Sequence, residues 1–187
     1  MLNLDIGCGR RKIPGFIGID HIPWDGVDII ASIENLPIKT AVCNKIRCYH
    51  VLEHLNHPIQ AMEEAWRVLK TEGIYEIQVP HFTGMADHSD ITHKRAFSSL
   101  SLDHFCENKI KKRGIPPYTA WFFNLDRVKL NFHDLNRVGK QFERFKVGSL
   151  VVKIIDFLAA QNIVIAERFW GRLIGGFDHI TFWLRKI

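Results

Sequence analysis

The chain contains no apolar run that approaches the roughly 20 residues a membrane-spanning helix needs. Its first residues also lack a basic region followed by a cleavable apolar stretch, so no secretion signal is visible. None of the four cysteines stands at Cys-x-x-Cys spacing. We therefore expect a cytoplasmic protein with reduced, mostly buried thiols, rather than a disulfide or zinc framework.

Internal repeats and low-complexity tracts are also missing from the 187 residues, and this length suits one domain over residues 1–187. The hydrophobic share of 47% and the charged share of 24% are typical of a globular protein. The net charge is +5, with basic residues gathered in 10–12, 109–113 and 127–146. No nucleic-acid-binding motif accompanies them, which favours a solvated basic face but leaves an RNA footprint open.

The first residues contain an apolar strand that runs directly into a glycine turn. Leu2–Ile6 precedes Gly7-Cys8-Gly9, and a second apolar segment ends on Asp20. Glycine lets the backbone approach a ligand closely, and an acid at the tip of the next strand can accept hydrogen bonds from a ribose diol. The third glycine of Gly-x-Gly-x-x-Gly is missing, which argues against NAD and FAD. The pattern predicts a different adenosine-containing cofactor.

Short apolar segments alternate with helical patterns, which predicts a parallel sheet with right-handed crossovers. Only about ten residues separate the first two strands, so at most one helical turn fits between them. Residues 81–125 are rich in His, Asp, Ser and aromatics and are predicted to form an inserted lid or substrate segment. The predicted strands are 2–6, 16–20, 27–31, 45–49, 74–79, 142–147 and 179–184, and the predicted helices are 58–70 and 150–160.

Several blocks, taken in order, resemble the class I S-adenosylmethionine-dependent methyltransferases, particularly the methyltransferase type 11 group. These blocks are Leu4–Gly9, Pro14–Asp20, Tyr49–Leu55, Ala65–Pro80 and Asp87–Phe97. The resemblance implies an α/β, Rossmann-like fold with a mostly parallel seven-stranded sheet, an antiparallel last strand and helices on both faces. It also implies S-adenosylmethionine as the cofactor.

The resemblance assigns roles to cofactor-binding residues. The turn residues contact the cofactor, with Asp5 either reaching its amino end through water or only capping the turn. Asp20 binds the ribose. Near the adenine, Ser32 replaces the family's usual acid, and its hydroxyl can still accept a hydrogen bond. Glu34 is a candidate substitute for that acid and ranks behind Ile33 as an adenine contact. For Glu53 and His54, structural and functional roles are equally open. The implied cofactor-binding residues are Asp5, Gly7, Cys8, Gly9, Asp20, Ser32, Ile33 and, on the methionine side, His50.

Methyl transfer from a sulfonium needs mainly proximity and alignment, and it needs a base only if the acceptor must lose a proton. Bases are available in the predicted insert, and Asp87 and His93 are the candidate catalytic residues because they align with the family segment. A structural role for the cluster stays open. Its spacing matches no zinc signature, so we predict no metal site. The full cluster is His81, Asp87, His88, Asp90 and His93.

The range of methyl acceptors is narrowed by two sequence motifs that the chain lacks. Adenine-N6 and cytosine-N4 methyltransferases carry an Asn/Asp-Pro-Pro-aromatic run after the fourth strand, where this chain has Tyr49–Leu52. Cys106 has no flanking proline of the kind that marks an RNA cytosine-C5 nucleophile. The leading prediction is a small-molecule or glycan-precursor acceptor, with no membrane partner. RNA gripped by 109–113 and a non-catalytic binding module are the alternatives. The oligomeric state is open.

Overall fold

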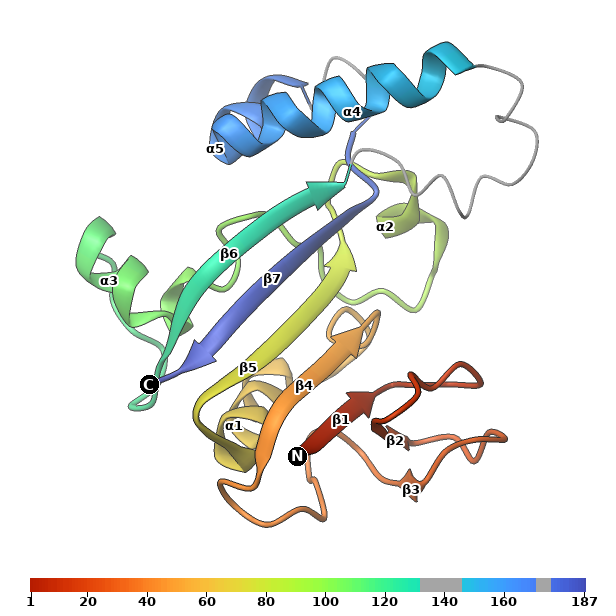
Figure 1. Cartoon of the computed structure of the whole chain (residues 1–187). Helices are drawn as coiled ribbons and strands as arrows, with labels where there is room; N and C mark the ends of the chain where they lie inside the picture. The colour runs from red at the N-terminus through yellow and green to blue at the C-terminus, as the bar shows by residue number, and fades with distance from the viewer. Residues whose placement is uncertain (132–145, 171–175) are drawn as a thin grey trace.

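The computed structural model describes residues 1–131, 146–170 and 176–187. The strands within these ranges form one seven-stranded sheet in the order β3-β2-β1-β4-β5-β7-β6 (Figure 1). β7 runs antiparallel to both of its neighbours, and the other paired strands are parallel. The predicted fold class is confirmed. The strands are β1 (Leu2–Ile6), β2 (Ile17–Asp20), β3 (Ile29–Ile30), β4 (Cys43–Tyr49), β5 (Leu69–Pro80), β6 (Phe123–Asn131) and β7 (His179–Lys186).

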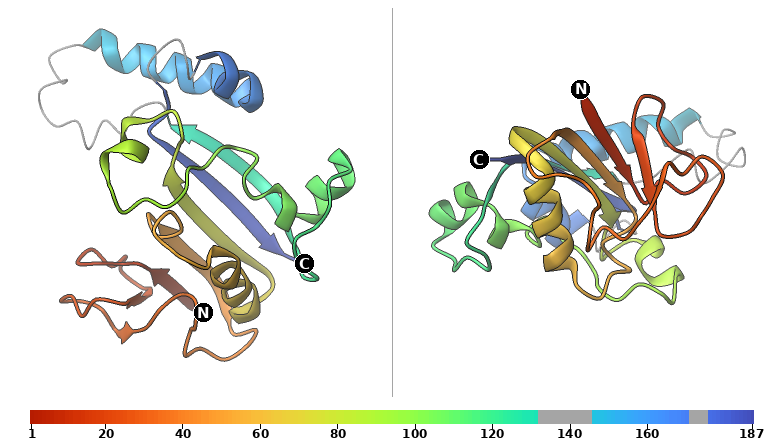
Figure 2. Two further views of the ribbon diagram at one scale, coloured as in Figure 1. Left: turned by 180° about the vertical axis from the view of Figure 1, so that it is seen from behind. Right: turned by 90° about the horizontal axis from the view of Figure 1, so that it is seen from below.

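The helices are unevenly distributed around this sheet. α1 packs against β5, whereas α4 and α5 lie beyond the carboxyl end of β6 and α3 lies near its start (Figures 1 and 2). No described helix is long and apolar enough to cross a membrane. The helical elements are α1 (Pro58–Val68), α2 (Met85–Ser89), η1 (Asp103–Phe105), α3 (Glu107–Arg113), α4 (Lys146–Gln161), α5 (Ile163–Ile165) and η3 (Ala166–Trp170).

α1 forms where the sequence predicts a helix. Pro58 occupies its first turn, where the missing N–H leaves no helical bond unmade. The positions that recur at helical spacing and become buried are Ala61, Met62, Ala65 and Val68. The helix ends when Leu69 adopts extended backbone angles, and β5 begins at that same residue. The predicted helix end and strand start are therefore shifted by a few residues.

The strand β6 was missed because its side-chain alternation is interrupted. Phe123 and Leu125, two residues apart, are both buried, as expected for one face of a strand. The pairing register with β7 then shifts between Leu125 and Arg127. The partly and fully buried positions that follow are Val128 and Leu130. A bulge of this kind moves the apolar residues from odd to even positions, so no period of two is visible. In the predicted strand 142–147, residues 142–145 lie outside the described ranges, whereas 146 and 147 begin α4.

The predicted insert, 81–125, leaves the carboxyl end of β5 and includes α2, η1 and α3, and its last three residues lie in β6. Its first part closes back on itself, because the Phe82 N–H donates to the Phe97 carbonyl at 2.9 Å. It is also tied to the sheet edge after β4, where the Lys94 N–H donates to the Glu53 carbonyl at 2.8 Å. The first part of the insert therefore lies over the carboxyl edge of the sheet, whereas α3 lies at the opposite edge, near the start of β6 (Figure 1).

Arg67 fastens the loop after β3 to α1. Its guanidinium donates to Glu64 at 2.6 Å and to the carbonyl oxygens of Ile38 and Leu36 at 2.8 and 3.1 Å. Glu64 in turn accepts the Leu36 N–H at 2.8 Å. One side chain thus satisfies carbonyl groups that no strand or helix partners.

We expect Arg67→Ala to lower the free energy of unfolding by about 1–3 kcal/mol, because these carbonyl oxygens lose a charged donor. Urea unfolding followed by circular dichroism measures this. Arg11→Ala is the matched control, since Arg11 is exposed and its loss should change stability by less than about 0.5 kcal/mol. Equal stability of the two variants would contradict the assigned role.

Candidate cofactor and acceptor site

The turn after β1 requires glycine at its first position. Gly7 has φ +68°, and its N–H donates to the Ile19 carbonyl of β2 at 2.8 Å. A Cβ at Gly7 would lie 2.2 Å from Val51 Cγ2, so the backbone here passes close to the segment after β4. Gly9 has φ +51°, but a Cβ there would meet nothing within 4 Å. Close packing therefore constrains Gly7, whereas only backbone conformation constrains Gly9.

Asp20 lies at the tip of β2 and holds the glycine turn in place. One carboxylate oxygen accepts the Gly9 N–H at 2.9 Å, and the other accepts the Ile22 N–H at 2.9 Å. The residue is buried. Because a carboxylate offers about four lone-pair sites, these two bonds leave Asp20 able to accept further hydrogen bonds.

A cavity of about 380 Å³ lies at the carboxyl ends of β1 and β2, beside the segment that follows β4. Four of the predicted cofactor residues line it: Gly7, Asp20, Ser32 and Ile33. The sequence did not predict most of the other residues that line the cavity, including Lys94 from the insert, because they belong to no recognisable cofactor-binding motif. These are Ile6, Ile19, His21, Ala31, Glu34, Val51, His54, Leu55, Asn56 and Lys94.

Asp5 and Cys8 are placed behind this cavity rather than on its wall. Asp5 is 1% exposed and accepts hydrogen bonds from the Ile13 N–H and from Arg47 Nη1, both at 3.0 Å. The Cys8 thiol packs towards β2, since a Cβ at Gly18 would lie 2.8 Å from its Sγ. Burial, reinforced by nearby Asp5, raises the pKa of the Cys8 thiol. In the structure both side chains support the turn, and a contact with cofactor stays a prediction for each.

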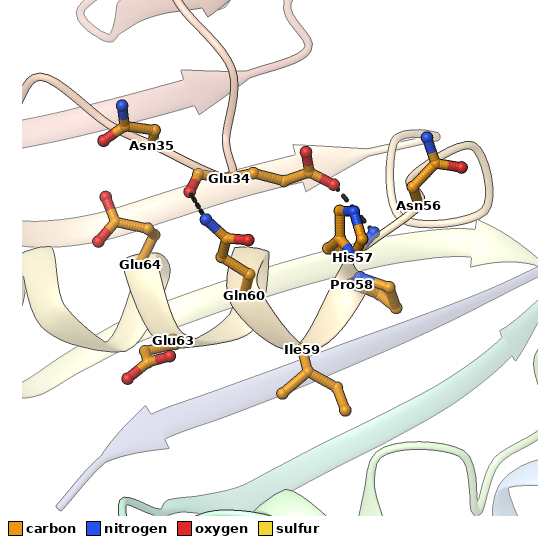
Figure 3. Close-up of a pocket in the computed structure, with 9 residues that line it drawn as sticks. All are labelled: Glu34, Asn35, Asn56, His57, Pro58, Ile59, Gln60, Glu63 and Glu64. Atoms are coloured by element: carbon orange, nitrogen blue, oxygen red, sulfur yellow. Dashed lines mark hydrogen bonds between the residues drawn. The ribbon is translucent and has the colours of Figure 1, made fainter.

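The segment after β3 contributes the candidate adenine wall. Ile33 is buried, and the Ser32 hydroxyl accepts the Glu34 N–H at 3.1 Å. Glu34 turns the other way: its carboxylate accepts the His57 N–H at 3.0 Å and its carbonyl accepts Gln60 Nε2 at 2.8 Å (Figure 3).

A larger hollow of about 640 Å³ lies on that side, at the start of α1 (Figure 3). Glu34 and Asn56 line both hollows. Of these two hollows, the smaller one is the candidate cofactor site, because only it is lined by Gly7 of the glycine turn and Asp20, the strand-tip acid.

His50 follows β4 directly with φ +57°, a conformation that few residues other than glycine adopt. Its ring meets that of His179 edge to face, with centroids 4.9 Å apart. Its Nδ1 lies 3.3 Å from Glu53 Oε1. His50 is therefore at the carboxyl edge of β4, where ligands of open α/β sheets bind, and its contact with the cofactor stays a prediction.

The structure separates the polar residues of the insert into two groups. His81 is fully buried, with Nε2 2.9 Å from Glu167 and Nδ1 2.7 Å from the Thr83 hydroxyl. Asp90 accepts the N–H and hydroxyl of Thr92 at 2.8 and 2.7 Å. These residues hold the insert together. His88 is exposed.

Asp87 and His93, the candidate catalytic residues, lie in contact. His93 Nδ1 donates to the Asp87 carbonyl at 2.9 Å, which leaves the lone pair on Nε2. The Asp87 side chain is buried, and burial raises the pKa of its carboxyl. Asp87 Oδ1 has no hydrogen-bond partner among the described residues. The His93 ring packs 4.8 Å from the ring of His54, which lines the cavity.

A mostly parallel sheet with a glycine turn after β1 and an acid at the tip of β2 is the arrangement found in Rossmann-like folds that bind nucleotide-containing cofactors. Residues 20–77 match the family model described as a methyltransferase domain. No curated protein sequence matches the chain.

Many solved structures share the fold. A SAM-dependent methyltransferase from Archaeoglobus fulgidus is 20% identical, with a TM-score of 0.59 over 98% of this chain and 85% of that one. A SAM-dependent methyltransferase from Thermotoga maritima is 15% identical, with a TM-score of 0.54 over 100% and 82%. A chain from a complex with the Haloferax volcanii Trm112 methyltransferase activator is 12% identical, with a TM-score of 0.58 over 99% and 81%.

Residues 20–77 thus match a methyltransferase domain, and the fold is the one found in SAM-dependent methyltransferases. S-adenosylmethionine is the cofactor that they imply. The residues present fit it, because the cavity combines a glycine wall, a strand-tip carboxylate with lone pairs to spare, and the buried apolar Ile33.

We expect Asp20→Ala to weaken S-adenosylmethionine binding by one to two orders of magnitude, about 1.5–3 kcal/mol, because charged hydrogen bonds to the ligand are lost. Its melting temperature should also fall, since the Gly9 and Ile22 N–H groups lose their acceptor. Titration calorimetry measures the affinity. Asp25→Ala, at an exposed acid outside the cavity wall, should bind normally. A folded Asp20→Ala protein of unchanged affinity would remove Asp20 from the site.

Proposed function

We propose that this chain transfers a methyl group from S-adenosylmethionine to a small molecule or glycan precursor, and that it does so in the cytoplasm. One observation carries the acceptor class: the cofactor cavity adjoins a cluster of buried and half-buried polar groups where the insert meets the segment after β4. His54 lines the cavity and packs on His93, which in turn holds Asp87. Such a small, partly buried polar site suits a compact acceptor. The free, buried state of all four thiols fits the proposed compartment.

The chain's own residues divide the work of binding and positioning. Gly7 leaves space at the cavity wall, Asp20 accepts hydrogen bonds, and Ile33 provides apolar surface. The bound cofactor supplies an activated methyl group, so alignment is the main requirement. Asp87 and His93 are the residues that we propose to position or deprotonate the acceptor. A raised carboxyl pKa makes Asp87 a better proton acceptor than an exposed carboxylate.

The position of the basic run 109–113 disfavours the RNA alternative. This run lies in α3, which contacts the start of β6. Because β6 is parallel to β5, the start of β6 lies at the sheet edge opposite the cavity (Figure 1). Two of its cations are already paired: Lys111 lies 2.9 Å from Glu107, and Arg113 bonds Asp103. A strand of RNA held there would not approach the cofactor cavity directly.

We test the proposal by calorimetry with S-adenosylmethionine and with its demethylated product. We expect both ligands to bind. If neither binds, the result would instead support a non-catalytic module. Methyl transfer is then followed from labelled cofactor to fractionated small-molecule and glycan-precursor pools. Transfer confined to RNA would overturn the proposed acceptor class.

Asp87→Asn and His93→Ala should leave S-adenosylmethionine affinity near wild type, while turnover falls by roughly two to four orders of magnitude. His88→Ala is the matched control and should keep full turnover, because His88 is exposed and follows Asp87 in α2. A drop in cofactor affinity equal to the drop in turnover would contradict an acceptor-side role.

The stability of Asp87→Asn gives this experiment an internal control. Because burial raises the folded-state pKa above 3.8, the ionised carboxylate costs stability at neutral pH, and a neutral amide removes that cost. The melting temperature at pH 7 should therefore stay equal or rise. The difference from wild type should shrink as the pH falls through the folded-state pKa.

Salt dependence separates the two acceptor classes. An RNA acceptor requires binding that weakens steeply as salt rises, and the slope should flatten when Lys111, Lys112 and Arg113 are neutralised. For a small acceptor we expect turnover to change less than about threefold between 50 and 200 mM salt, against the roughly 10³-fold or greater loss of affinity that many phosphate contacts produce. A steep slope that the triple variant flattens would favour RNA.

A further inference from the structure

Glu53 is a buried carboxylate without a hydrogen-bond partner among the described residues. The residue is 0% exposed, and neither of its carboxylate oxygens has such a partner. His50 Nδ1 lies 3.3 Å from Oε1, but its geometry is not that of a hydrogen bond. A charge buried without a partner is costly, so such groups are paired or coordinate a metal. The site around Glu53 therefore calls for a cation.

Two histidines beside Glu53 each present a free lone pair. The Thr92 hydroxyl donates to Asp90 at 2.7 Å, so it accepts the hydrogen bond from His54 Nδ1 at 2.9 Å. His93 Nδ1 donates to the Asp87 carbonyl at 2.9 Å. In both rings the proton is on Nδ1, and the Nε2 lone pair is left for another partner. Histidines that bind metals are oriented in this way, with the second nitrogen donating to a carbonyl, carboxylate or similar acceptor.

We propose that Glu53, His54 and His93 bind a divalent zinc ion. One potential ligand atom from each residue lies within 4.8 Å of the others. Two imidazoles and one carboxylate are a known catalytic zinc set, which keeps a fourth position for water or substrate. The nitrogen ligands favour zinc over magnesium or calcium, which prefer oxygen.

The ion would connect two distant parts of the chain at the cofactor cavity. Glu53 and His54 follow β4, whereas His93 belongs to the insert. His54 also lines the cavity, so the ion lies beside it and leaves a coordination position for an acceptor oxygen. Zinc binding itself does not depend on which acceptor is used. It makes His93 a ligand through Nε2, so that Asp87 remains as the residue able to take a proton.

The test is direct metal binding to the whole protein. Protein stripped with a chelator is titrated with Zn²⁺ against a chromophoric competitor, and metal content is measured after dialysis. We expect one equivalent of zinc. Glu53→Gln, His54→Ala and His93→Ala should each weaken zinc binding by at least 100-fold, whereas His88→Ala should not change it. X-ray absorption should show Zn–N distances of about 2.0–2.1 Å.

A variant of Thr92, which contacts His54 and not the ion, and a cofactor titration keep this test separate from that of methyl transfer. Thr92→Val removes the acceptor of His54 Nδ1 and should weaken zinc binding by about 10–100-fold, with circular dichroism confirming the fold. Absence of stoichiometric zinc, or equal zinc affinity of His93→Ala and His88→Ala, would overturn the site. If Glu53→Gln weakens S-adenosylmethionine binding and leaves zinc binding intact, Glu53 is a cofactor residue and the metal proposal fails. Zinc binding without methyl transfer would instead overturn only the proposed function.

Discussion

The hydrogen bonds between Asp20 and the glycine turn set the geometry on which the cofactor site depends. Asp20 ends β2 and Gly9 follows β1, so one carboxylate fixes two strand ends against each other. It also accepts the Ile22 N–H, which fixes the turn that follows β2. On the other side, Val51 packs so closely on Gly7 that no side chain fits between them. The cavity is therefore framed by three neighbouring segments before any ligand binds.

The insert is held over this frame by a different set of interactions. Glu167 accepts from His81 and from the Ser99 hydroxyl. Burial acts to raise the pKa of Glu167, but these hydrogen bonds outweigh it and lower the pKa. Both nitrogens of His81 are engaged, because Nδ1 accepts from Thr83 while Nε2 donates to Glu167. Because both ring nitrogens of His81 are engaged, it has no free lone pair with which to take a proton from a methyl acceptor. The candidate proton acceptors are therefore the neighbouring groups with free lone pairs, Asp87 and His93.

The fold was largely predictable from the sequence, whereas the site was predictable only where a backbone motif marks it. Apolar strands such as Leu2–Ile6 and the helix that begins at Pro58 carry local patterns, and both formed as expected. β6 escaped because a bulge shifts its alternation. Lys94 reaches the cavity wall only through the fold of the insert, and no spacing along the chain indicates that approach. Which insert residue is structural also depends on partners distant in sequence, as His81 and Glu167 show.

The absence of described helices between β1 and β4 explains why the insert matters to the site. Residues 7–16 connect β1 to β2 by turns alone, and the connections on either side of β3 are likewise free of helices. The cavity therefore lies at a thinly covered part of the sheet. Lys94 supplies wall from the insert, with its Nζ 2.7 Å from Asn56 Oδ1 across the cavity rim. Since that segment also contains His93, the arrangement of the insert that closes one wall of the cavity also places His93 beside His54. A zinc ion between Glu53 and His93 would stabilise the same closed arrangement.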